Sequence, residues 1–124
     1  MKNVKNNNVI WFLDEIYHQD FMVVFAPTHD KFRGIVLDEL GIEIEPEEAD
    51  GQFYGMYCPH GQHSIAIIWS SNKGGNLIHE CFHACSWVLR NRNINLLSDD
   101  ADEAYAYYLT YIWQAIKDRM KLKN

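Results

Sequence analysis

The sequence predicts an α+β fold in which a small antiparallel sheet packs on helices, and three observations lead to that prediction. An apolar fraction of 48% over 124 residues is enough to bury one hydrophobic core. Short aromatic and β-branched runs bounded by turn residues indicate strands in the first 70 residues. Helical periodicity dominates the remainder. No repeat or linker interrupts the chain, so we expect a single domain over residues 1–124, with a frayed Asn-rich start at residues 1–8.

The first third of the chain reads as helix, strand, helix. Apolar residues recur with helical spacing over residues 9–17, which predicts a short amphipathic helix. Residues 21–26 form a β-branched and aromatic run closed by Pro27, the pattern of a strand. Thr28 is a suitable N-cap for a second helix, and Gly41 is a natural C-terminal stop for it.

The rest of the chain reads as a β-hairpin followed by two helices. The runs at residues 52–58 and 63–69 flank a Pro-His-Gly-Gln turn and predict the hairpin. A Gly-rich loop then leads into a helix expected over residues 76–90. Ser98 can cap the last helix, which should end near Lys121 with cations gathered in its last turns.

Charge disfavours a nucleic-acid partner. The formal net charge is −6, and seven acids fall between Asp38 and Asp50, a run that reads as a solvated acidic loop. The sequence shows no basic stripe that could neutralise phosphates.

The cysteines and the N-terminus favour a cytoplasmic protein. Cys58, Cys81 and Cys85 are too few and too oddly spaced for a disulfide framework, so reduced thiols are expected. The apolar run at residues 9–13 is stopped by Asp14, which makes it too short for a signal peptide or a membrane span. We therefore expect a soluble, unexported protein without a membrane partner.

The segment His79-Glu80-Cys81-Phe82-His83 carries the chemistry. Residues four apart on a helix lie on one face, so both imidazoles can converge on one zinc ion. Glu80 lies about 100° around the helix from His79. It can therefore stay out of the ligand set and still reach a water on the metal, which is the position of a general base.

A third protein ligand must come from elsewhere in the chain. The start of the last helix offers several acids, of which Glu103 is the preferred candidate because the following alanines would allow close helix packing. Asp102 and Asp99 are the alternatives. Two histidines and one carboxylate leave a position open for water, the pattern of a catalytic zinc site.

The histidine motif, followed about twenty residues later by Asp-Glu-Ala-Tyr-Ala-Tyr from Asp102, resembles the minimal gluzincin metallopeptidases, including small phage- and prophage-encoded members. The resemblance covers roughly residues 51–116. It implies zinc bound by His79, His83 and Glu103, with Glu80 as base. It also implies that the strand before the motif, from Ile65 to Trp69, is a sheet edge on which an extended peptide substrate docks.

The sequence leaves open the identity of the oxyanion stabiliser and the choice between an enzyme and a non-catalytic module. The oxyanion stabiliser of such enzymes is usually Tyr or His, for which Tyr107, His60 and His63 are candidates, although each also reads as a core or turn residue. The predicted function is a zinc metallopeptidase acting on an extended peptide or flexible segment. The alternative is a non-catalytic module, for example a phage assembly or virion component, in which zinc staples two helices.

Overall fold

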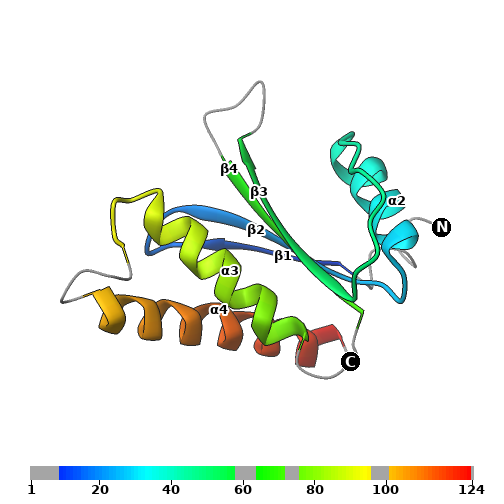
Figure 1. Ribbon diagram of the computed structural model, residues 1–124. Helices are drawn as coiled ribbons and strands as arrows, with labels where there is room; N and C mark the ends of the chain where they lie inside the picture. The colour runs from blue at the N-terminus through cyan, green and yellow to red at the C-terminus, as the bar shows by residue number, and fades with distance from the viewer. Residues whose placement is uncertain (1–8, 58–63, 72–75, 96–100, 124) are drawn as a thin grey trace.

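The computed structural model describes residues 9–57, 64–71, 76–95 and 101–123, and Figure 1 shows their arrangement. Within these ranges the chain forms one mixed four-stranded sheet and three helices. The elements in chain order are β1 (Val9–Asp14), β2 (Gln19–Phe25), α2 (His29–Leu40), β3 (Gly51–Tyr57), β4 (Ser64–Ser70), α3 (Asn76–Arg90) and α4 (Ala101–Lys123). The predicted α+β class is confirmed.

The sheet is mixed, so the prediction of a purely antiparallel sheet was wrong. The strand order is β1-β2-β4-β3, with antiparallel pairs at both ends and a parallel pair, β2 and β4, in the middle. A parallel pair needs a long connection, and α2 together with β3 supplies it between β2 and β4. Turn residues in the sequence identified the hairpin, but no local signal identifies a pairing between strands about 45 residues apart.

The predicted first helix is a strand. In β1 the side chains of Ile10, Phe12 and Asp14 are buried, whereas those of Trp11 and Leu13 are exposed, which is the two-residue alternation of a strand. Its run of β-branched and aromatic residues suits a pleated surface. Pairing with β2 therefore outweighed a helical spacing that rested on few residues.

The other predicted elements are confirmed within the described ranges. Thr28 accepts a hydrogen bond from the backbone N–H of Lys31 at the start of α2, and Gly41 ends that helix at φ = 67°. The hairpin strands pair antiparallel. The helix with the histidine motif begins at Asn76 and ends at Arg90 as predicted. The Ser98 cap lies outside the described residues, and α4 is described from Ala101.

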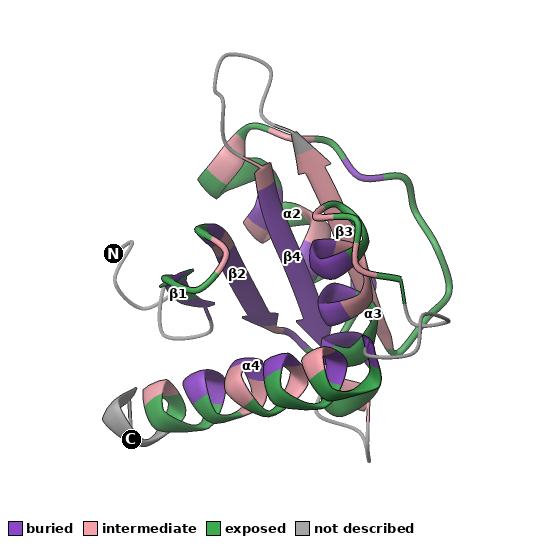
Figure 2. Cartoon of the chain, turned by 90° about the vertical axis from the view of Figure 1, so that its left-hand side faces the viewer, coloured by how far each residue is buried: buried purple, intermediate pink, exposed green. Residues whose placement is uncertain are grey.

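Helices cover both faces of the sheet (Figure 1). Helices α3 and α4 pack on the face that carries Phe12, Phe21 and Ala66, and Figure 2 shows the buried residues of α4 on its side turned toward the sheet. On the opposite face, α2 buries Phe32 against Trp69 of β4, with stacked rings 5.3 Å apart. The histidine helix therefore packs against both the sheet and its neighbour α4.

Strand β4 is central, which corrects the expectation that Ile65 to Trp69 form a sheet edge. It pairs with β2 on one side and β3 on the other. Residues Ile65 to Ser70 are all buried, as expected for a continuous apolar run covered on both faces. The edge strand beside the histidine helix is β3. No helix in the described part of the chain is long and apolar enough to span a membrane.

Candidate metal centre

The two motif histidines converge on the exposed side of α3. The Nε2 atoms of His79 and His83 are 3.1 Å apart, and the two ring centroids are 4.7 Å apart. Both residues are exposed, whereas Cys81, Ala84 and Cys85 on the opposite side of the helix are fully buried. Burial of the apolar side thus directs both imidazoles outward, where an ion from solvent can reach them.

This separation suits a shared zinc ion. Two nitrogens, each about 2.0–2.1 Å from one tetrahedral zinc ion, stand roughly 3.3 Å apart. The observed 3.1 Å is within a few tenths of that value. Without metal, the same separation lets one ring donate a hydrogen bond to the other. The pair needs little rearrangement to bind zinc.

Glu80 lies beside the pair but turns toward the sheet. Its side chain is only 8% exposed. A Cβ added at Gly51 of β3 would lie 3.2 Å from Glu80 Oε2, so the missing side chain at Gly51 leaves room for the carboxylate. Burial raises the pKa of the Glu80 carboxyl, while the neighbouring His79 and His83 rings act in the opposite direction. A raised pKa suits a group that must take up and release a proton.

A groove runs along the edge of β3 past Glu80 and His83. Its volume is about 360 Å³. The residues that line it come from α3, from β3 and from the segment before β3: Glu80, His83, Arg90, Gly51, Gln52, Phe53, Glu47 and Ala49. An unpaired strand edge beside a candidate base is the place where an extended peptide could add to the sheet. The edge position predicted for β4 therefore belongs to β3.

A hydrogen-bonded ring around His29 holds the far wall of the groove. The backbone N–H of Glu47 donates to His29 Nδ1 over 3.2 Å, so Nε2 carries the proton and donates to Gln52 Oε1 over 2.7 Å. The side-chain amide of Gln52 donates in turn to the Glu47 carboxylate. Because His29 is buried against Trp69, this ring fixes the acidic segment to β3.

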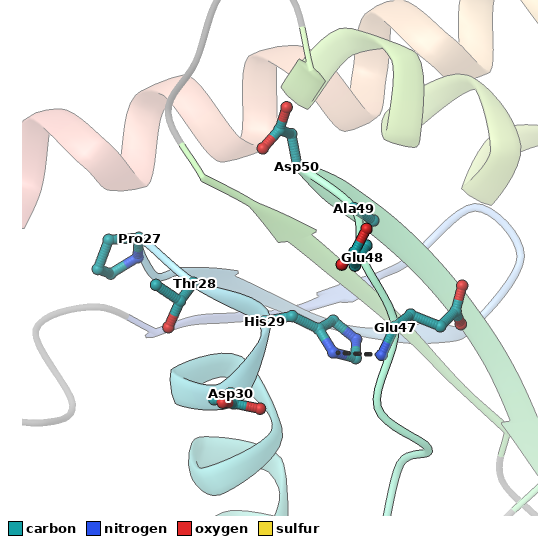
Figure 3. A pocket seen from close by; sticks show the side chains of 8 residues that line it. All are labelled: Pro27, Thr28, His29, Asp30, Glu47, Glu48, Ala49 and Asp50. Atoms are coloured by element: carbon teal, nitrogen blue, oxygen red, sulfur yellow. Dashed lines mark hydrogen bonds between the residues drawn. The ribbon is translucent and has the colours of Figure 1, made fainter.

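The same segment borders a second cavity, of about 560 Å³, at the start of α2, and Figure 3 shows its lining residues with the His29–Glu47 hydrogen bond dashed. The lining residues are Pro27, Thr28, His29, Asp30, Glu47, Glu48, Ala49 and Asp50. It contains neither motif histidine. The buried polar side chain that it offers, His29, has both ring nitrogens engaged.

Among the described residues, no carboxylate joins the histidine pair as a third ligand. Within the described ranges, no three His, Cys, Asp or Glu side chains lie close enough together to hold one metal ion. Glu103 is exposed in the first turn of α4. The Cys85 thiol, on the buried side of α3, contacts the carbonyl oxygen of Tyr105 in α4 at 3.5 Å, so the two helices pack together just beyond the motif. Asp102 accepts a hydrogen bond from the backbone N–H of Glu103, as expected for an acid at a helix start.

The other site residues predicted from the sequence are either exposed away from the core or outside the described residues. Tyr107 is 72% exposed on α4 and does not pack in the core, and no hydrogen bond or ring contact joins it to the histidine pair among the described residues. His60, His63, Asp99 and Cys58 lie outside the described residues.

No family model matches this chain, and no curated protein or solved structure matches it either.

The sequence did not identify three residues in or around the groove. His29 carries no local signal, because its partners, Glu47 and Gln52, come from a separate part of the chain. Gly55 was not singled out, although a Cβ there would lie 2.2 Å from the Trp87 ring of α3. Arg90 was read only as a helix end. For Gly55, the signal in the sequence was a glycine inside a strand pattern, which often marks close approach of another element.

Proposed function

We propose that this protein is a zinc-dependent metallopeptidase that hydrolyses extended peptides or flexible protein segments. The observation that carries the proposal is the geometry of α3. Two exposed imidazoles present nitrogens 3.1 Å apart, and the intervening carboxylate of Glu80 is buried toward a groove along a sheet edge. A site that only held zinc would have no need for a carboxylate in that position.

His79 and His83 would hold the zinc ion, with Glu103 as the proposed third ligand. When bound, the ion supplies Lewis acidity that polarises the scissile carbonyl and lowers the pKa of the attacking water. The resemblance to small phage- and prophage-encoded gluzincins is part of this proposal. We also propose a cytoplasmic location, because the three cysteines are too few and too oddly spaced for a disulfide framework.

Glu80 performs the proton transfers. Its carboxylate accepts a proton from the attacking water and later delivers it to the leaving amine. Strand β3 positions the substrate, because main-chain hydrogen bonds to an unpaired edge orient an extended peptide whatever its side chains. Tyr107 is the proposed oxyanion stabiliser; it would have to reach the groove from the exposed face of α4.

The first test measures zinc. Purified protein should carry about one zinc ion per chain by elemental analysis or native mass spectrometry, and His79→Ala or His83→Ala should abolish binding. Full zinc retention by His83→Ala would refute the metal site.

The second test separates enzyme from zinc staple. Glu80→Gln keeps the size of the side chain but cannot accept a proton, so zinc content should be unchanged. Cleavage of unstructured peptides should fall by about 10²–10⁴-fold. Glu39→Gln, which alters an exposed acid on α2, is the matched control and should cleave like wild type. Equal activity of Glu80→Gln and wild type would refute the mechanism. Wild-type protein that holds zinc but cleaves no peptide in a diverse library would favour the non-catalytic module.

A further inference from the structure

We propose that Arg90 selects substrates carrying an acidic side chain about two or three residues from the scissile bond. This inference rests on the proposed peptidase function and adds a substrate class to it. Arg90 lines the same groove as Glu80 and His83, near the C-terminal end of α3.

The Arg90 side chain folds back along α3 toward the histidine pair. Its Nε donates to the carbonyl oxygen of Ser86 over 3.4 Å, one helical turn earlier. The residue is exposed, and its terminal nitrogens make no hydrogen bond to any residue in the described ranges. Among the described residues, none occupies the end of the guanidinium that could pair with a carboxylate.

The position of the Arg90 guanidinium sets the spacing between the acidic residue of the substrate and the scissile bond. Ser86 follows His83 by one helical turn and His79 by two, so at about 1.5 Å per residue it lies roughly 5–10 Å from the level of the two histidines. An extended peptide advances about 3.3 Å per residue, so this distance corresponds to about two or three residues.

The relative direction of α3 and β3 sets the side of the scissile bond. Glu80 approaches Gly51, and Trp87 approaches Gly55, so the helix and the strand run the same way along the groove. A peptide that pairs antiparallel with β3 runs the other way. It therefore presents the residues N-terminal to the scissile bond to Arg90.

The groove lining combines the Arg90 cation with the acids Glu47 and Glu80. The protein has a formal net charge of −6, which repels acidic peptides in general. Among the groove residues, the carboxylate of Glu47 is engaged by Gln52 and Tyr54, and Glu80 is turned toward Gly51. Arg90 supplies the permanent positive charge of the described lining. If Arg90 only stabilised the C-terminal end of the α3 dipole, cleavage would not depend on the charge of the substrate.

The experiment compares matched peptides with Asp or Asn at each position within four residues of the cleaved bond. Cleavage by the zinc-loaded protein is one measurement. Binding to the Glu80→Gln variant is the other, since it does not depend on turnover. Arg90→Met retains most of the side-chain length without the charge. Lys31→Met removes an exposed cation from α2, on the opposite face of the sheet, as the control.

With wild-type Arg90, an Asp about two or three residues before the scissile bond should improve cleavage and binding by about two- to fivefold, the range of exposed ion pairs. The preference should vanish in Arg90→Met, persist in Lys31→Met, and weaken at high salt. Cleavage with no acidic preference, or a preference that survives Arg90→Met, would overturn this inference and leave the peptidase proposal intact. Absence of both cleavage and binding would overturn both.

Discussion

Gly55→Ala is the substitution that most directly tests the packing of the histidine helix on the edge strand. A Cβ at this position would lie 2.2, 2.5 and 2.6 Å from three atoms of the Trp87 ring, well inside van der Waals contact. The ring is large and rigid, and it is held from another side by Phe53, with ring centroids 5.7 Å apart. The new methyl group can be accommodated only if α3 or β3 moves.

Overpacking of this kind costs about 1–3 kcal/mol of folding free energy, which for a chain of this length lowers Tm by roughly 4–12 °C. Thermal unfolding followed by circular dichroism measures the shift. Gly34→Ala is the matched control. A Cβ at Gly34 meets nothing within 4 Å, so alanine in the helix interior should stabilise by about 0.5–1 kcal/mol.

A double-mutant cycle identifies the cause. In a Trp87→Leu background the clash is relieved, so Gly55→Ala should cost little, and the coupling between the two sites should be about 1–3 kcal/mol. An unchanged Tm for Gly55→Ala would refute the reasoning. So would an equal loss of stability in both backgrounds, because the loss would then come from the strand itself and not from contact with α3.

Three further predictions follow from the site. Glu103→Ala should weaken zinc affinity strongly, whereas Asp102→Ala should cost only some tenths of a kcal/mol from the helix start; zinc titration that ranks them the other way would move the third ligand to Asp102. In metal-free protein, burial raises the pKa of the Glu80 carboxyl above its ordinary 4.5. Just above pH 4.5 the folded state therefore binds more protons than the unfolded state, so the stability of the wild type falls as the pH rises. The Tm advantage of Glu80→Gln should therefore grow from pH 4 to pH 7, and a constant difference would contradict this burial. Burial also raises the pKa of the Cys81 and Cys85 thiols to about 12, so both should resist alkylation at pH 8 until the protein unfolds; rapid modification of either in the folded protein, located by mass spectrometry, would show that α3 opens.

Local chemistry in the sequence was sufficient for most elements. A capping threonine and a terminal glycine predicted α2, aromatic and β-branched runs predicted the hairpin strands, and apolar periodicity predicted a helix from about Asn76 to Arg90. The four-residue spacing of His79 and His83 likewise predicted that their nitrogens meet on one face, because it depends only on the helical repeat. Such inferences succeed when the determining residues are neighbours in the chain.

Features that depend on distant partners were decided only by the tertiary structure. Residues 9–14 pair with β2 as a strand, and the parallel pairing of β2 with β4 makes β4 central and leaves β3 as the edge beside α3. The same is true of the groove, whose walls come from three segments, and of the His29 ring that fixes one of them. The period of apolar residues in the sequence predicts which side of a helix or strand is apolar. It does not predict which other element covers that side, because this is decided only when the sheet and helices bury their apolar faces together.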